Sequence, residues 1–214
     1  ISSIQHGIAI LGYNTIKGLI LSSGISATFK RTSNEGLFDY TNFWLQTTLC
    51  ATLATDFAKI NVMYSNEDKE EVFSAAILHD IGKLILNQYD SKNYKKVLVS
   101  EISPIDYSNL LLAEEKYCII NHTQAGQVVT DAWNLPELIP LSAQYHHMPL
   151  SAPEKIQKLT SVIYIADILS NLILNKIEPQ EDMFDRNILE KYNFKFSDII
   201  QKYKDFEENP AKLL

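Results

Sequence analysis

Apolar residues recur at helical spacing along most of this chain. Between residues 13 and 29, for example, Ile16, Leu19, Ile20 and Ile25 lie at intervals close to the 3.6-residue period of a helix. Further helices are predicted at about 41–63, from SNED at 65–68 through the His79-Asp80 pair, and at about 92–101, 106–120, 123–133, 137–146 and 154–175. No convincing strand pattern interrupts them. The sequence therefore predicts an all-α fold.

Capping residues and a glycine suggest where two of these helices begin or end. Asp39 or Thr41 can cap the helix that runs to about residue 63, because their side-chain oxygens accept hydrogen bonds from free backbone N–H groups. Gly82 comes just after the His79-Asp80 pair. We therefore expect the helix that carries this pair to end or bend at Gly82.

The chain changes character after about residue 177. Charged residues become more frequent there, and two amphipathic helices are predicted, at about 185–192 and 197–207. We therefore expect one helical domain over residues 1–177 and a helical extension over 178–214 that packs on it. Because the chain starts at Ile1 inside a helical pattern, we also expect natural sequence upstream of this residue.

Composition and charge restrict the class of partner. The chain has 214 residues, of which 46% are hydrophobic, an ordinary globular balance. Its 19 basic and 26 acidic residues give a net charge of −7, which argues against binding to nucleic-acid phosphates. The small basic cluster of Lys92, Lys95 and Lys96 is typical of a solvated helix face. No segment approaches the roughly 18 uninterrupted apolar residues of a membrane span, so we expect neither nucleic acid nor membrane as a partner.

Two cysteines, Cys50 and Cys118, each lie in an apolar helical segment. Both are typical of small buried hydrophobic side chains. Neither has a partner at the spacing of a metal motif, and two cysteines make no disulfide framework. We therefore expect a cytoplasmic protein in a reducing compartment.

The chemically informative residues are four of the five histidines and a few aspartates. They are the His79-Asp80 pair in AAILHDIGKLIL, His122 in NHTQAG, the His146-His147 doublet in AQYHHMP, and Asp167 in VIYIADIL. Imidazole and carboxylate are ligands that suit a divalent transition metal. This clustering predicts a metal site, or descent from a chain that had one.

Each of these residues also has an interpretation without metal. The His79-Asp80 pair is then a capping pair on a buried turn, His122 is a capping or solvated residue, and the doublet complements the dipole at a helix C-terminus. Asp167 is the strongest anomaly, because isoleucine and leucine residues surround it in the sequence. A carboxylate is rarely buried in such a setting without a partner, and this favours a ligand role or an ancestral one.

These segments together resemble the HDOD domain, the HD-related output domain of bacterial signalling proteins. That family belongs to the superfamily of HD metal-dependent phosphohydrolases, which includes the HD-GYP cyclic-dinucleotide phosphodiesterases. The segments similar to the family, in order, are ISSIQHGIAILGYNTIKGLIL, in which His6 has no ligand role, FWLQTTLCATLA, AAILHDIGKLIL, and the stretch from Glu115 through His122, Gly126, Trp133, Leu135 and Pro136 to His146-His147 and Pro149. The part after about residue 178 lies outside this resemblance.

The resemblance implies an HD-like helical bundle with five core helices and a site for one or two divalent ions, Fe, Mn, Zn or Ni. It carries metal-ligand roles onto His79, Asp80, His122, His146, His147 and Asp167. It implies catalytic roles for Asp80, as a bridging ligand, and for Lys83, near a bound phosphate. The alternative for Lys83 is a surface lysine whose stem packs on apolar atoms. Glu115 either orients a ligand or forms an ion pair on the helix surface.

Two departures from the hydrolase pattern bear on the predicted function, and the first of them decides it. Gln46, in FWLQTT, stands where the HD hydrolases have a histidine, and a neutral amide binds a transition metal poorly. MPLSAP lacks the Gly-Tyr-Pro motif that follows the doublet in HD-GYP enzymes. We therefore expect a bacterial signal-transduction output module without turnover, which keeps most of a metal site whether or not an ion is bound. Its expected partners are a signalling protein or a fused sensor or output domain, with a nucleotide as a candidate ligand.

The alternative function is a metal-dependent phosphohydrolase or phosphodiesterase that acts on nucleotides or cyclic dinucleotides. In that case the ions would lower the pKa of a bound water, and Lys83 would offset negative charge that develops on the substrate. Bound metal together with metal-dependent hydrolysis favours the enzyme. Unchanged stability in chelator, with no bound metal, favours the module.

Overall fold

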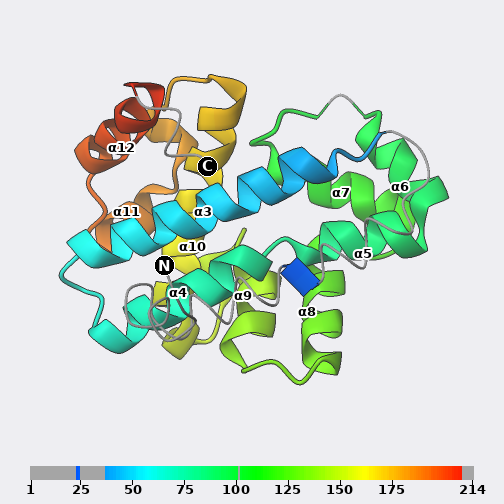
Figure 1. Ribbon diagram of the computed structural model, residues 1–214, viewed down its shortest axis with the longest axis horizontal. Coiled ribbons are helices and arrows are strands. Elements are labelled where there is room, and N and C mark those ends of the chain that lie inside the picture. The colour runs from blue at the N-terminus through cyan, green and yellow to red at the C-terminus, as the bar shows by residue number, and fades with distance from the viewer. Residues whose placement is uncertain (1–22, 25–36, 101, 209–214) are drawn as a thin grey trace, which may run out of the picture.

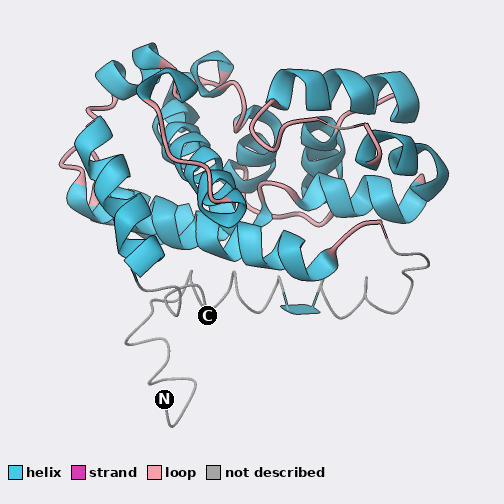
Figure 2. Ribbon diagram, turned by 90° about the horizontal axis from the view of Figure 1, so that it is seen from above, coloured by secondary structure: helices cyan, strands magenta, loops and turns pink. Residues whose placement is uncertain are grey.

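A computed structural model describes residues 23–24, 37–100 and 102–208 of the chain, and every regular element longer than one turn in these ranges is an α-helix (Figures 1 and 2). The α-helices are α3 (Tyr40–Ile60), α4 (Asn66–Leu78), α5 (Ile81–Tyr89), α6 (Ser91–Leu98), α7 (Tyr107–Cys118), α8 (His122–Ala132), α9 (Leu138–Tyr145), α10 (Glu154–Asn175), α11 (Arg186–Lys191) and α12 (Phe196–Glu208). Two short 3-10 helices, η1 (Pro149–Ser151) and η2 (Glu181–Met183), lie between them. The predicted all-α fold is confirmed. The helix predicted at about 13–29 lies, apart from residues 23 and 24, outside the described residues.

The two longest helices, α3 and α10, pack against each other and hold the main core (Figure 1). Asp39 caps α3 as predicted, since its side chain accepts a hydrogen bond from the Asn42 backbone N–H at 3.0 Å. Helix α3 buries small residues such as Ala51 and Ala54, which let α10 and α4 approach closely. Although α10 is long and apolar enough to cross a membrane, 72% of its apolar window is buried inside the fold. Its apolar character is therefore explained by core packing.

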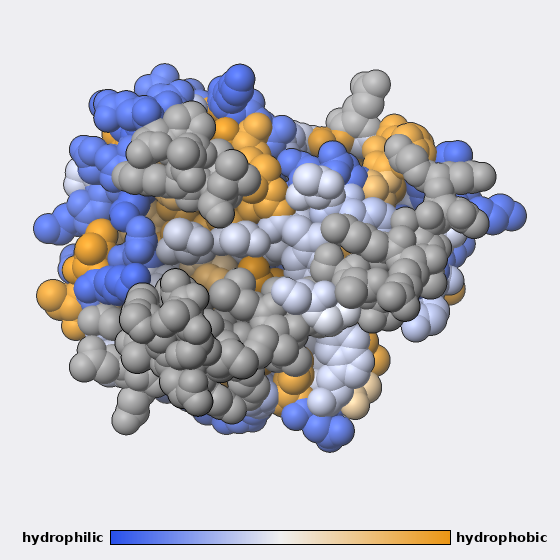
Figure 3. All heavy atoms as spheres, viewed as in Figure 1, coloured by the Kyte–Doolittle hydropathy of each residue, from blue (hydrophilic) through white to orange (hydrophobic). Residues whose placement is uncertain are grey.

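The segment after residue 177 shares this core. Phe184, Ile188, Tyr203 and Phe206 are buried in the same cluster as the apolar residues of α3, α4 and α10. Helix α12 also packs on α10. Where Figure 1 places α11 and α12, Figure 3 shows many hydrophilic side chains with smaller groups of hydrophobic ones between them. The division of the chain at residue 177 into a domain and an extension stays a prediction.

The chain breaks its helix at the His79-Asp80 pair, earlier than predicted. Helix α4 ends at Leu78 and α5 begins at Ile81, so the pair lies in the turn between them. Gly82 lies inside α5, where it allows a contact with α8. A Cβ added at Gly82 would lie 1.9 Å from the carbonyl oxygen of His122. The two helices therefore meet backbone to backbone, and only glycine fits at this position.

Gly126 belongs to the same contact. Its added Cβ would lie 3.2 Å from the Cβ of Ala143 in α9 and 3.4 Å from the backbone nitrogen of Gly82. The small residues of α8 thus give α5 and α9 room to pack closely on it. As a result, α5, α8 and α9 are held close together, and each of them carries or adjoins candidate ligand residues.

Candidate metal centre

The structure brings together all six side chains to which the sequence analysis assigned ligand roles. The turn after α4 supplies His79 and Asp80, the first residue of α8 is His122, the end of α9 supplies His146 and His147, and the middle of α10 supplies Asp167. Their side chains are all buried, with exposed fractions of 3% or less. Asn121, rather than His122, is the N-cap residue of α8 and forms a capping box with Gln124. The ligand roles themselves stay predictions.

Asp80, His122, His146 and His147 form a compact group, which we call the three-histidine set. One potential ligand atom from each of the four lies within 4.8 Å of the others. The Nε2 atom of His122 lies 3.0 Å from His147 Nε2 and 3.4 Å from His146 Nε2. The Asp80 Oδ1 atom lies 3.4 Å from His122 Nε2 and 3.5 Å from His146 Nε2. Three imidazoles and a carboxylate thus turn their donor atoms toward a common point.

Two of these imidazoles are held from behind through their other nitrogen. His122 Nδ1 lies 2.6 Å from Glu114 Oε2, and His146 Nδ1 lies 2.8 Å from the carbonyl oxygen of Ala143. A carbonyl oxygen only accepts, so Nδ1 of His146 carries the proton and its Nε2 presents a lone pair. A carboxylate favours the same tautomer in His122. Metal-ligating histidines characteristically donate their other N–H to a carboxylate or a backbone carbonyl in this way.

Glu114 is the carboxylate that orients His122, whereas the sequence analysis considered Glu115 for such a role. Glu114 is fully buried, and its Oε2 also accepts the backbone N–H of His122 at 2.8 Å. Glu115 instead accepts a hydrogen bond from the Asn121 side chain at 2.7 Å. A signal for Glu114 was available, because it lies four residues before the apolar Cys118 and so on the same face of α7.

Cys50, His79 and Asp167 form a second group, which we call the Cys50 set. One potential ligand atom from each lies within 4.8 Å of the others, and all three residues are buried. Cys50 is fully buried, as the sequence predicted, but its proximity to His79 and Asp167 was not foreseen. The available signal was its place on α3, four residues after Gln46 and therefore on the same helix face.

Gln46 occupies the edge of this second group and contacts Asp167. Its Nε2 donates to Asp167 Oδ1 at 2.6 Å and to the Ser170 hydroxyl at 3.1 Å. Asn171 donates to the same Asp167 oxygen at 3.1 Å. One oxygen of Asp167 is therefore satisfied by side-chain amides.

Several buried donor and acceptor atoms of the site have no hydrogen-bond partner within the described part of the chain. They are His79 Nε2, Asp80 Oδ1, His147 Nδ1 and Asp167 Oδ2. Leaving a buried polar atom unpaired costs about 1–3 kcal/mol, more if it is charged. A divalent cation would satisfy lone pairs on several of these residues at once, and imidazole and carboxylate are donors it prefers. The residues present therefore fit a divalent transition metal.

The electrostatic balance of the site keeps its carboxylates ionised. Burial opposes the charge of Asp80, but the ammonium group of Lys83 and the nearby His79 outweigh it and hold the pKa of Asp80 well below its usual range. Burial likewise opposes the charge of Asp167, and His79 outweighs it, so the pKa of Asp167 is lowered. Burial and the neighbouring His146 lower the pKa of His147 well below its ordinary value, which favours a neutral imidazole.

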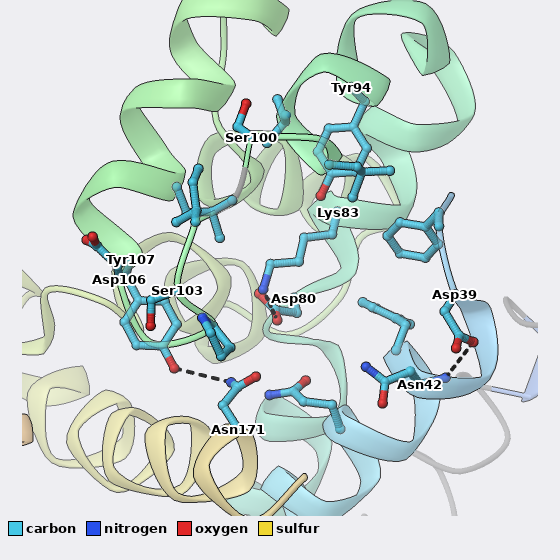
Figure 4. A pocket seen from close by; sticks show the side chains of 18 of the residues that line it. Asp39, Asn42, Asp80, Lys83, Tyr94, Ser100, Ser103, Asp106, Tyr107 and Asn171 are labelled. Carbon is cyan, nitrogen blue, oxygen red and sulfur yellow. Dashed lines mark hydrogen bonds and ion pairs between the residues drawn. The ribbon is translucent and has the colours of Figure 1, made fainter. Parts of the chain in front are cut away.

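A cavity of about 360 Å³ adjoins the site on the side of α3, α5 and α7 (Figure 4). Lys83 extends along its wall to Asp80, and the Lys83 Nζ atom lies 2.6 Å from Asp80 Oδ2. Lys83 is therefore not a surface lysine with a free head group. Tyr107 lies across the cavity and stacks on His147, with ring centroids 4.1 Å apart.

Comparisons with known proteins show which family model the sequence matches and which solved structures share its fold. The sequence model of the HDOD domain matches residues 1–149. No curated protein matches the chain. Among solved structures, an HDOD domain protein of unknown function from Geobacter sulfurreducens is 20% identical with a TM-score of 0.67, and the match covers 100% of this chain and 73% of that one.

Two further solved structures share the fold. A candidate phosphohydrolase from Shewanella amazonensis is 20% identical with a TM-score of 0.70, over 96% of this chain and 73% of that one. A candidate signal transduction protein from Marinobacter aquaeolei is 17% identical with a TM-score of 0.73, over 95% of this chain and 44% of that one. At these identities the likeness concerns the fold alone.

Proposed function

The chain belongs to the HDOD domain family, and from this premise we propose that it is an output module of bacterial, cytoplasmic signal transduction that retains a divalent metal ion without hydrolysing a phosphoester. The ion would be held by the three-histidine set, with His79 and Asp167 beside it. When bound, it would supply a Lewis acid in the interior of the bundle. Its role here would be to fix the relative positions of α5, α8, α9 and α10.

The observation that carries this proposal is the contact between Gln46 and Asp167. The HD hydrolases have a histidine at the position of Gln46, which would bring an imidazole nitrogen toward the metal. In this chain the Gln46 amide nitrogen points at Asp167 Oδ1 from 2.6 Å and donates a hydrogen bond. An N–H donor cannot bind a cation, and it competes for the lone pairs of a predicted ligand. The contact thus supports a site with weakened catalytic ability.

Lys83 supports the same proposal. Its ammonium group forms a 2.6 Å ion pair with Asp80, and the Asp80 carboxylate raises the pKa of Lys83 even though burial opposes its charge. A lysine that neutralises an aspartate has less charge to offer a substrate phosphate. The name of the Marinobacter relative also points toward signalling. A fused sensor domain or a separate signalling protein would be the partner.

The second candidate function is a metal-dependent phosphohydrolase acting on nucleotides or cyclic dinucleotides. The observation that favours it is the cavity beside Asp80 and Lys83, whose volume of about 360 Å³ lies within the range of small-molecule sites. In this case Asp80 would bind the ion and Lys83 would contact the substrate. The name of the Shewanella relative is consistent with this activity.

Metal analysis combined with an activity assay separates the two functions. The protein would be purified without added metal, its metal content measured, and phosphodiester and nucleotide substrates tested with Mn²⁺ and Fe²⁺. We expect bound metal and no turnover. Hydrolysis that depends on the metal and disappears in Asp80→Asn would overturn the proposal in favour of the enzyme.

A further inference from the structure

The lost ligand position at Gln46 has a neighbour able to replace it. Cys50 follows Gln46 by one helical turn on α3, so both side chains lie on the face that packs against α10. Cys50 is fully buried and lies beside His79 and Asp167. Among the described residues, its thiol makes one weak hydrogen bond, to the carbonyl oxygen of Ile163 at 3.9 Å. The helix that gave up an imidazole donor thus places a thiol beside the same carboxylate.

The other two members of the Cys50 set each present a buried atom without a hydrogen bond to any described residue. His79 Nδ1 donates to the carbonyl oxygen of Ala76 at 2.6 Å, which directs its Nε2 into the site. Within the described residues, His79 Nε2 and Asp167 Oδ2 have no hydrogen-bond partner, and both side chains are at most 1% exposed. His79 Nε2 faces Asp167 Oδ1 at 3.4 Å and Asp80 Oδ2 at 3.5 Å. A cation placed between this nitrogen and the two carboxylate oxygens would be stabilised by all three.

We propose that Cys50, His79 and Asp167 bind a thiophilic divalent cation such as Zn²⁺, with Cys50 supplying the donor that Gln46 does not. Thiolate, imidazole and carboxylate are the three donor types found in protein zinc sites, and zinc tolerates three protein ligands with a fourth position left open. The thiol proton is released to solvent when the ion binds. This inference rests on the proposed function only in placing a cation in the same interior. It differs in the donor atoms and in the preferred metal.

The same geometry predicts a division of preference between the two groups. The three-histidine set offers only nitrogen and oxygen donors, which suit manganese and iron as well as zinc. The Cys50 set offers sulfur, which favours zinc and cobalt over manganese. Two unlike ions are therefore expected to occupy adjacent places, instead of one kind of ion in both.

Titration of the metal-free full chain with Co²⁺ tests this proposal, because a cysteine thiolate bound to Co²⁺ gives a charge-transfer absorption in the near ultraviolet that nitrogen and oxygen ligands do not give. We expect this absorption in the unaltered protein and its loss when Zn²⁺ is added in excess. The chain has only two cysteines, so Cys118→Ser is the matched control. If the absorption persists in Cys118→Ser, Cys50 must be its source, and this conclusion does not require a Cys50 variant that folds.

Cys50→Ser is the second variant and is expected to lose the absorption while it keeps a helical circular dichroism spectrum. Cobalt that binds with visible absorption alone, without the thiolate absorption, would overturn the role of Cys50 and leave the three-histidine set and the proposed function in place. A thiolate absorption that disappears in Cys118→Ser would also overturn it. The absence of any cobalt binding would contradict both this inference and the metal-holding part of the proposed function.

Discussion

Two groups of donor atoms share the interior of this protein, and they differ in the neighbours that contact their ligand residues. In the three-histidine set, Glu114 and the Ala143 carbonyl contact the outer nitrogens of His122 and His146, which leaves the inner nitrogens free for a cation. In the Cys50 set, the Ala76 carbonyl holds the outer nitrogen of His79 in the same way, but Gln46 donates to Asp167 Oδ1 and leaves Asp167 Oδ2 for a cation. A partner on the outer nitrogen of a histidine keeps the inner nitrogen available to a metal, whereas an N–H donor on a ligand oxygen competes with the metal. The comparison suggests that the two groups differ in affinity and in metal preference.

The strongest test of the comparison disturbs the backbone contact between α5 and α8, which positions His122 of the three-histidine set. Gly82→Ala would place a Cβ 1.9 Å from the His122 carbonyl oxygen and 2.7 Å from the Gly126 nitrogen, both backbone atoms that cannot rotate away. We expect α8 to shift and the free energy of unfolding in urea to fall by about 3 kcal/mol. Gly126→Ala is the control, since its Cβ meets a side chain at 3.2 Å, and it should cost about 1 kcal/mol. Equal effects of the two substitutions would contradict the backbone contact.

Removal of metal is expected to have the next largest effect. A ligand that binds only the folded state at a concentration of 100 times its Kd stabilises that state by about 2.7 kcal/mol. Chelation of the metal-loaded protein should therefore lower the free energy of unfolding by about that amount, as measured by urea denaturation with and without Zn²⁺ or Mn²⁺. Stability that does not change in chelator would argue against a metal-holding module.

Glu114→Gln tests the outer support of His122 directly. The substitution removes the carboxylate that contacts both Nδ1 and the backbone N–H of His122 in a fully buried place. We expect a loss of about 2 kcal/mol in unfolding free energy and a 10- to 100-fold loss of metal affinity. Glu115→Gln is the matched control one residue later and should change metal affinity little, since Glu115 is exposed and accepts its hydrogen bond from the Asn121 side chain. If both variants weaken metal binding alike, Glu114 has no special role.

Gln46→His tests the Cys50 set and has the smallest expected effect of the four changes. It removes the amide donor from Asp167 and adds an imidazole, so Mn²⁺ should bind about tenfold more tightly, equivalent to about 1.4 kcal/mol. Isothermal titration calorimetry measures this change. Asn42→His, one turn earlier on α3 and also on the cavity wall, serves as the control and should leave Mn²⁺ affinity unchanged. An unchanged affinity in Gln46→His would mean that the amide of Gln46 does not limit metal binding.

Periodicity and capping predicted the helices well because both are local properties. The cap of α3 at Asp39 and the extent of α10 follow from patterns within a few residues. The resemblance to the HDOD family, carried by motifs in a fixed order, is confirmed by the family match. The break between Leu78 and Ile81 was placed too late, because apolar residues continue on both sides of it and Gly82 was taken as its marker.

The unforeseen features of the site depend on contacts between distant segments. Nothing near Cys50 in the sequence indicates His79 or Asp167, which α4 and α10 bring to it. The choice between Glu114 and Glu115 likewise depends on which face of α7 is turned inward. Adjacent residues on a helix point about 100° apart, so an error of one position exchanges a buried carboxylate for an exposed one.

The contact at Gly82 also determines which properties of the cavity can vary independently. Where α5 and α8 touch through peptide units, no rotamer change can alter the separation between the turn that carries Asp80 and the residue that begins α8. Substitutions of Val97 and Leu98 on the α6 wall of the cavity can therefore alter the size and polarity of the molecules admitted while the donor spacing stays the same. The choice of ligand and the spacing of the donor atoms can therefore change independently of each other in this fold.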